Sequence, residues 1–125
     1  MKITIMDTTL RDGEQTSGVT LTATEKLNIA KLLLVDLNVD RIEVASARVS
    51  EGEFKGAGLI FDWAREHGHI EKVEVLGFID GDVSLKWIHD AGGKVNNLLM
   101  KGSLKHCETQ LRKTPEEHIA DVKDV

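Results

Sequence analysis

DTTLRDGEQ, residues 7–15, is the stretch of sequence on which the fold assignment depends. It follows a short run, residues 2–6, in which Ile3 and Ile5 alternate with polar neighbours, a pattern typical of a strand. In barrels of parallel strands, chemistry sits in the loops after the carboxyl ends of the strands. Arg11 and Asp12 therefore lie where such a loop would place a site.

Helix signals follow this loop. Three capping patterns predict the starts of helices: Thr22 with Glu25, Ser50 with Glu53, and Thr114 with Pro115 and Glu117. Apolar residues recur at helical spacing after the first two of these patterns. Gly68 is expected to end the second helix in a left-handed conformation, and Asp82 to cap a short third helix that stops at Gly92.

Strand patterns alternate with these helices at residues 41–45, 72–78 and 94–100. Together with the first strand they give four β/α units over residues 1–125, which predicts an α/β protein with a parallel sheet. Doubling the units gives about 250 residues, the usual size of an eight-unit barrel. A small doubly wound sheet fits the periodicity equally well. Because the last helix reaches Val125 without a closing cap, we expect the chain to be truncated at this end.

Composition and charge exclude several classes of protein. The chain has 125 residues, a formal net charge of −5, two Trp, three Phe and no Tyr, so it offers neither a basic nor an aromatic surface for nucleic acid. No apolar run approaches the roughly 20 residues that span a bilayer, and no signal peptide is recognisable. Cys107 is the only cysteine, which favours a cytoplasmic protein without a disulfide.

The pairing of Arg11 with Asp12 has two interpretations. A carboxylate can bind a divalent cation while a guanidinium stabilises developing negative oxygen, which is the chemistry of an active site. Adjacent opposite charges are also common on solvated loops, and residue types alone favour this second interpretation by roughly two to one. The longer string that surrounds the pair reverses this preference.

Residues 7–15 resemble the opening signature of the family that contains 2-isopropylmalate, citramalate and homocitrate synthases, with the related hydroxymethylglutaryl-CoA lyases. The resemblance implies a (β/α)8 TIM barrel, of which residues 1–125 would form the N-terminal half. It implies that Arg11 is a catalytic residue that stabilises the enolate or keto oxygen, and that Asp12 ligates the metal. Glu14 and Gln15 belong to the string and are expected as hydrogen-bonding residues of the substrate pocket.

The second strand extends the resemblance. Residues 41–46, RIEVAS, are similar to the family's second strand, whose glutamate faces the site. That position is Glu43, which the resemblance makes a catalytic residue. An inward-facing carboxylate needs a partner, and Arg11 is the natural one. The alternative is a strand-end carboxylate in water.

The third and fourth strands are most similar to the citramalate synthase branch, through residues 75–78 and 97–103. In that branch, leucines at the ends of these strands shape a small pocket for the methyl group of pyruvate. The matching positions are Leu76 and Leu99, which the resemblance makes substrate-binding residues. The alternative is that both are ordinary barrel core.

The activity that the resemblance implies is an acyl transfer of the Claisen type, in which acetyl-CoA condenses with a 2-oxo acid. Pyruvate is favoured, giving citramalate, and the implied cofactor is a divalent cation, Zn, Mn or Mg. Alternatives in the family are 2-isopropylmalate or homocitrate synthesis and a hydroxymethylglutaryl-CoA lyase-like reaction. Alternatives of other classes are an inactive α/β fragment and a nucleotide-binding signalling domain, which the context of residues 8–11 does not fit.

The same resemblance implies which partners the protein has and whether the isolated chain is active. We expect small-molecule partners and a homo-oligomer, and no nucleic acid or membrane partner. The family's later metal ligands, a His-x-His pair, come from a part of the barrel beyond residue 125. The isolated chain is therefore expected to be inactive.

The histidines and the cysteine of this chain are interpreted as structural. His67 and His69 form a His-x-His pair at the end of the second helix, on the far side of the sheet from Asp12, so we expect a polar helix terminus. His106 beside Cys107 lacks the third group of a nucleophilic pair. The remaining two, His89 and His118, are expected on polar helix faces.

Overall fold

The fold is a four-stranded parallel sheet whose strands follow one another in chain order, as a computed structural model of residues 1–125 shows. The strands are β1 (Met6–Asp7), β2 (Arg41–Ser46), β3 (Val73–Gly77) and β4 (Val95–Leu98). The helices are α1 (Ala23–Lys31), α2 (Glu51–Glu66), α3 (Val83–Asp90), α4 (Leu104–His106) and α5 (Pro115–Asp124). The chain also has two 3-10 helices, η1 (Gly13–Gln15) and η3 (Ile70–Lys72), and two π-helical segments, η2 (Leu32–Asp36) and η4 (Cys107–Leu111).

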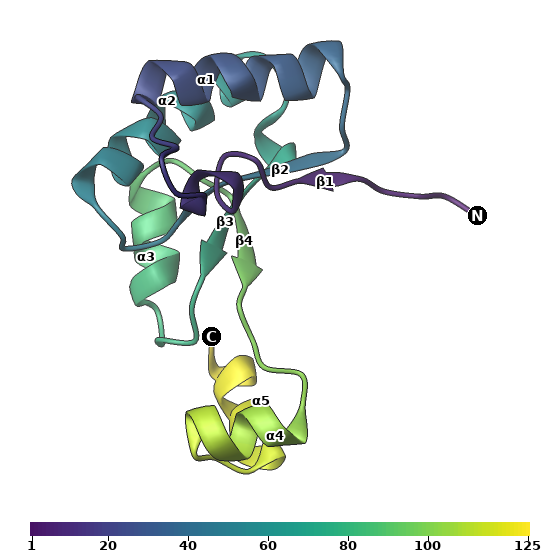
Figure 1. The fold of residues 1–125 in the computed structure, drawn as a ribbon, viewed down its shortest axis with the longest axis vertical. Helices are drawn as coiled ribbons and strands as arrows, with labels where there is room; N and C mark the ends of the chain where they lie inside the picture. The colour runs from purple at the N-terminus through teal and green to yellow at the C-terminus, as the bar shows by residue number, and fades with distance from the viewer.

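The sheet order decides between the two fold classes that periodicity left open. A doubly wound sheet reverses its strand order at a switch point and carries helices on both faces. Here every strand pairs in parallel with its sequence neighbour, and α1, α2 and α3 lie side by side around one side of the strands (Figure 1). This is the arrangement of four consecutive units of a (β/α)8 barrel, which confirms the predicted fold class.

The core lies between the strands and the helices. It contains 17 buried residues, with Val44 and Val75 from the strands packed among Ile60 and Phe61 from α2. Full burial of such a side chain contributes roughly 1.5–3 kcal/mol. Gly93 is required for this packing, because a Cβ there would lie 2.6 Å from Cζ of Phe61.

Most of the predicted helix ends are confirmed. The boxes of Thr22 and Thr114 form both of their hydrogen bonds, and Gly68 adopts a φ of +75° after α2. The box at Ser50 is half formed: the Ser50 hydroxyl accepts from a backbone amide, 3.1 Å away. The side chain that should complete it, Glu53, instead pairs with Lys26.

The third helix begins where the sequence predicted, with Asp82 at the N-cap position, but the Asp82 side chain does not cap it. Asp82 makes no capping hydrogen bond, because its carboxylate pairs with Lys86 one turn along the helix, at 2.6 Å. Asp80 takes its place and accepts from the Ser84 backbone N–H at 3.0 Å and from the Ser84 hydroxyl at 2.7 Å. The sequence pattern therefore located the start of the helix correctly and assigned its capping hydrogen bond to the wrong aspartate.

The first strand is shorter than predicted and begins later. Residues 1–5 extend away from the sheet, although the Ile5 carbonyl still accepts from the backbone of Arg41 at 3.2 Å (Figure 1). Ile3 and Ile5 are 71% and 59% exposed, because β1 is an edge strand with a neighbour on one side only. At the other edge, β4 ends at Leu98 and not at residue 100, while the Leu99 N–H still donates to the Gly77 carbonyl at 2.9 Å.

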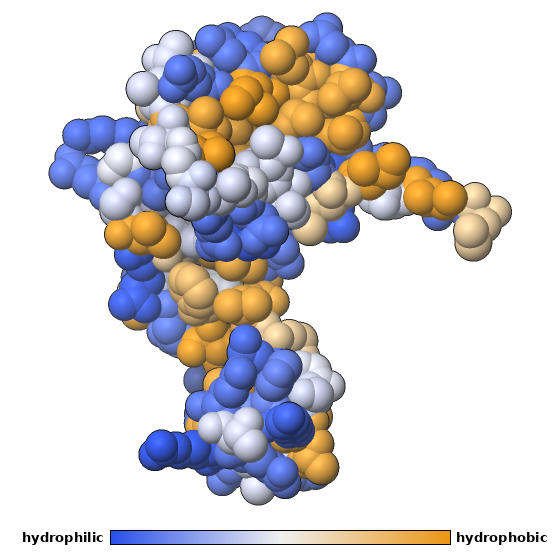
Figure 2. All heavy atoms as spheres, viewed as in Figure 1, coloured by the Kyte–Doolittle hydropathy of each residue, from blue (hydrophilic) through white to orange (hydrophobic).

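Apolar side chains are exposed around η2 and on the N-terminal tail. Figure 2 shows hydrophobic residues gathered over α1 and η2 and along the N-terminal tail. Leu32, Val35 and Leu37 are each more than half exposed. No helix of the structure combines the length and the apolar character needed to cross a bilayer.

Candidate active site

The signature loop after β1 is held rigidly by its own backbone. The carbonyl of Thr8 accepts from the amides of Arg11, Asp12 and Gly13, at 3.1, 2.8 and 3.2 Å. Leu10 is completely buried and anchors the loop in the core. Because these contacts fix the backbone, the side chains of Arg11 and Asp12 leave it in set directions.

Arg11 and Glu43 meet, as the sequence predicted. Nε of Arg11 donates to Oε2 of Glu43, and Nη1 of Arg11 donates to Oδ1 of Asp12 at 2.8 Å. Glu43 lies on β2 and is completely buried, so its charge requires partners inside the protein. The second partner is Asn97 on β4, whose Nδ2 donates to Oε1 of Glu43 at 2.6 Å.

This arrangement leaves one end of the Arg11 guanidinium open. Nη2 makes no hydrogen bond to the protein, whereas Nε and Nη1 are both engaged. The Arg11 side chain is 19% exposed and Asp12 is 61% exposed. A partly desolvated guanidinium with free donors, beside an accessible carboxylate, can bind and stabilise an anionic oxygen. Glu43 is buried next to Arg11, and each of its oxygens accepts a hydrogen bond from the protein.

Asp12 alone does not make a metal centre. Its exposed carboxylate is a suitable oxygen ligand for a divalent cation. Catalytic metal sites take about three protein ligands, and no group of three or more His, Cys, Asp and Glu side chains comes together in the structure. The residues present therefore fit one ligand of such a site.

Glu14 and Gln15 lie beside this group in different ways. Oε1 of Glu14 accepts from the backbone N–H of Leu21 at 3.1 Å, and Oε2 pairs with Lys26 at 2.5 Å. Both oxygens of Glu14 are thus engaged within the protein. Gln15 is exposed and shares with Arg11 and Glu14 a polar cleft of about 260 Å³ between the signature loop and the start of α2.

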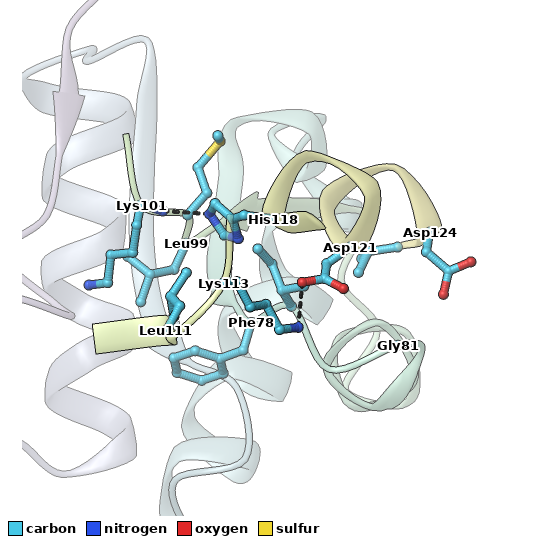
Figure 3. Close-up of a pocket in the computed structure, with 12 residues that line it drawn as sticks. Phe78, Gly81, Leu99, Lys101, Leu111, Lys113, His118, Asp121 and Asp124 are labelled. Atoms are coloured by element: carbon cyan, nitrogen blue, oxygen red, sulfur yellow. Dashed lines mark hydrogen bonds and ion pairs between the residues drawn. The ribbon is translucent and has the colours of Figure 1, made fainter. Parts of the chain in front are cut away.

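The two leucines are separated by the fold. Leu76 on β3 is half-buried and lies in register with Asn97, next to the Arg11–Glu43 pair. Leu99 is 40% exposed and lines a different cavity, of about 370 Å³, with Phe78, Leu111 and His118 (Figure 3). The structure therefore brings Leu76 close to the predicted catalytic residues and leaves Leu99 at the edge of the neighbouring cavity.

The interpretation of His118 as a residue on a polar face is wrong. His118 is 4% exposed, and its Nε2 accepts from the backbone N–H of Lys101 at 3.0 Å (Figure 3). The reason is tertiary: α5 folds back onto the segment after β4, with His118 on the inner side. His67 and His69 lie at the end of α2, as predicted, and the structure adds that both rings stack on Trp63.

The loops after β2 and β3 are tied together beside the site. Arg48 pairs with Asp80 at 2.7 Å, and Asp80 also accepts from Ser84. Burial pushes the pKa of Asp80 upward, but the hydrogen bonds from the Ser84 backbone and hydroxyl, together with Arg48, outweigh it and lower that pKa. This network fixes the relative position of two loops at the carboxyl ends of the strands.

Two contributors to the site were missed by sequence reasoning. Asn97 has low strand propensity, and a polar residue inside a strand was a signal that it had a specific partner. Lys26 is 3% exposed between Glu14 and Glu53, and it joins the signature loop to α1 and α2. Its place in an amphipathic helix gave no sign of burial.

Comparison with known proteins places this geometry in context. Residues 2–125 match the family model described as HMGL-like. The chain is 43% identical over 118 residues to a 2-isopropylmalate synthase of Pyrococcus furiosus, covering 93% of this chain and 23% of that protein. It is 42% identical over 117 residues to an (R)-citramalate synthase of Methanocaldococcus jannaschii, covering 94% and 23%. A 2-isopropylmalate synthase of Saccharolobus solfataricus is 40% identical over 123 residues, covering 93% and 29%. The chain thus spans about a quarter of the length of these relatives.

Proposed function

We propose a function from one premise: this chain belongs to the HMGL-like family. Residues 1–125 form the first four β/α units of a catalytic barrel that condenses acetyl-CoA with a 2-oxo acid. The observation that carries the proposal is the open Nη2 end of Arg11, held by Glu43 and adjacent to the exposed carboxylate of Asp12. The names of the relatives support this reaction class.

The chemistry requires charge stabilisation at oxygen. Removal of a proton from the methyl group of acetyl-CoA gives an enolate, which attacks the keto carbon of the 2-oxo acid and leaves an alkoxide. Hydrolysis of the thioester then releases CoA and a 2-hydroxy dicarboxylate. Arg11 donates from its free nitrogen to the oxygen on which negative charge develops, a contribution typically worth 10²–10³-fold in rate, or about 2.7–4 kcal/mol.

A divalent cation, Zn, Mn or Mg, held in part by Asp12, would polarise the keto group. Asp12 would supply one carboxylate ligand, and the remaining ligands would come from other parts of the proposed barrel. Glu43 neutralises Arg11 when no substrate is bound and keeps its guanidinium in one orientation. Glu14 and Gln15 bound the polar cleft beside Arg11, where Gln15 is free to bind substrate.

Pyruvate is the 2-oxo acid we propose, with citramalate as the product. Leu76 borders the Arg11 group through its register with Asn97, and Leu99 follows the last residue of β4, at the edge of the neighbouring cavity. Bulky leucines near the keto carbon leave room for a methyl group. The second candidate is 2-oxoisovalerate, because relatives named 2-isopropylmalate synthase are as similar as those named citramalate synthase.

The decisive experiment restores the rest of a barrel. This chain replaces the matching 118 residues of the Pyrococcus furiosus relative, and the purified hybrid is mixed with acetyl-CoA, a divalent cation and either oxo acid. Release of free CoA thiol is followed. We expect release with pyruvate that Arg11→Ala and Asp12→Ala abolish. A folded hybrid that releases no thiol with any 2-oxo acid would refute the proposed reaction.

A separate experiment asks whether residues 1–125 are active by themselves. We expect that they are not. Under the same conditions, residues 1–125 alone should release thiol no faster than a protein-free control. The chain supplies one metal ligand where about three are required. If the isolated chain released thiol and Asp12→Ala removed this release, residues 1–125 would be sufficient for the condensation. Oligomerisation of the hybrid, which we also propose, is checked by light scattering.

A further inference from the structure

Asn97 on β4 reaches across β3 to the partner of Arg11. Its Nδ2 lies 2.6 Å from Oε1 of Glu43, across 54 residues of sequence. We propose that Asn97 is a positioning residue, which locks the Glu43 carboxylate and thereby aims the Arg11 guanidinium at the reacting oxygen. This inference rests on the proposed condensation for its catalytic meaning, but its structural part can be tested without activity.

The identity of the contacting groups is fixed by chemistry. An ionised carboxylate can only accept, so the end of the Asn97 amide that faces Glu43 is the NH₂ group. Glu43 is completely buried, and its two oxygens are divided between two donors from different elements. Each oxygen therefore has one protein donor, from the signature loop on one side and from β4 on the other.

This division matters because the terminal torsion of a glutamate is soft. Rotation about the last side-chain bond has broad minima, so a single hydrogen bond does not fix the carboxylate plane. Arg11 contacts Glu43 through Nε and Asp12 through Nη1. The plane of the Glu43 carboxylate thus sets the tilt of the guanidinium and the direction of its free Nη2. Asn97 fixes that plane from the opposite side.

The position of Asn97 argues against a purely structural role. Asn97 is half-buried on β4, and its register partner on the neighbouring strand β3 is Leu76. Asparagine is poor in strands, and an apolar residue would serve the strand better. What asparagine adds here is a donor of the right length for Glu43.

Asn96 provides a matched control. It is the same residue type on the same strand, with the side chain on the other face, where its Oδ1 is buried without a hydrogen-bond partner. Replacement of Asn96 by Ala removes an unsatisfied polar group, and a folded variant retains the Glu43 contacts. A general effect of losing an asparagine from β4 would appear in both variants, whereas a positioning effect appears only at Asn97.

The structural test measures the Arg11 Nε–H by NMR in the 125-residue chain. The signal is assigned by its loss in Arg11→Lys, and its hydrogen exchange is compared among the parent, Asn97→Ala, Asn97→Ser and Asn96→Ala, all confirmed to be folded by thermal unfolding. We expect exchange at least about tenfold faster, with a shifted resonance, in both Asn97 variants. Asn96→Ala should stay within about twofold of the parent. Equal exchange in the Asn97 and Asn96 variants overturns the proposal.

The catalytic test uses the active hybrid. Misplacement of a reacting group by about 1 Å can cost on the order of 10²-fold, so Asn97→Ala should lower kcat by roughly that factor with little change in KM. An unchanged kcat alongside altered NMR exchange would reject the catalytic part of the inference. An inactive parent hybrid with altered exchange would instead refute the proposed condensation and leave the structural contact supported.

Discussion

Lys26 is the most sensitive point for a stability test, because it is a buried cation between two carboxylates. Its side chain is 4% exposed and pairs with Glu14 at 2.5 Å and with Glu53. We consider Lys26→Met, which keeps the aliphatic stem. That stem contacts α2 at Gly56, where an added Cβ would lie 3.6 Å from Cδ of Lys26. The substitution thus removes the charge and preserves most of the packing.

The magnitude follows from burial. Removing one partner of a buried ion pair costs about 3–5 kcal/mol, because the remaining charge is left uncompensated. The two carboxylates here are each 19% exposed, so water recovers part of that energy, and we expect a loss of roughly 2–4 kcal/mol in the free energy of unfolding. Glu14, which lies in the signature loop, would also lose its ion pair with α1.

The assay is equilibrium urea unfolding of the 125-residue chain, followed by circular dichroism. The matched control is Lys55→Met, since Lys55 pairs with Glu51 on the surface, with side-chain exposures of 68% and 81%. That pair should contribute less than about 0.5 kcal/mol. Adding Glu14→Gln and Glu53→Gln to Lys26→Met should recover much of the loss. Equal destabilisation by Lys26→Met and Lys55→Met would refute the reasoning.

Three further predictions concern the site and its surroundings. In the active hybrid, Arg11→Lys should reduce kcat by about 10²-fold or more, because lysine keeps the charge and loses the planar fork; turnover within a few-fold of the parent would remove Arg11 from the mechanism. Leu76→Ala or Leu99→Ala should shift the relative kcat/KM from pyruvate toward 2-oxoisovalerate by about 10–200-fold, and unchanged ratios would assign both leucines to the core. The pKa of Asp80 lies below its ordinary value of 3.8, so its contribution to stability is present above that pH and is lost as the pH falls through the folded-state value. Urea unfolding at about pH 5 and pH 3 should show a smaller loss on acidification for Asp80→Asn than for the parent.

The parts of the fold that sequence patterns predicted are those determined by neighbours along the chain. The boxes at Thr22 and Thr114 and the left-handed Gly68 each depend on contacts within a few residues. Strand positions were predicted because alternation and apolar runs report burial directly. The extent of the first strand was not, since pairing of residues 2–5 depends on a neighbour across the edge of the sheet.

Candidate site residues were predicted where they belong to a recognisable sequence motif. They were missed where only the tertiary fold brings them together. Arg11 and Glu43 were expected to pair, and they do. Asn97, by contrast, meets Glu43 across 54 positions, and its low strand propensity signals a partner without identifying which residue that partner is. His118 was misjudged for the same reason, because its burial results from the way α5 folds back.

The inner face of the sheet and the two edges of the sheet differ in whether their polar groups have partners, and this difference predicts where the isolated chain associates. The inner face carries charged and amide side chains that satisfy one another: Glu43 with Arg11 and Asn97, and Glu74 with Arg41 at 2.8 Å. Such a face tolerates water, because its polar groups already have partners. The unpaired edges of β1 and β4 and the exposed apolar residues Leu32, Val35 and Leu37 do not have this protection. Association of the isolated chain should therefore proceed through its edges, and the Arg11–Glu43–Asn97 group should keep its geometry whether or not those edges are covered.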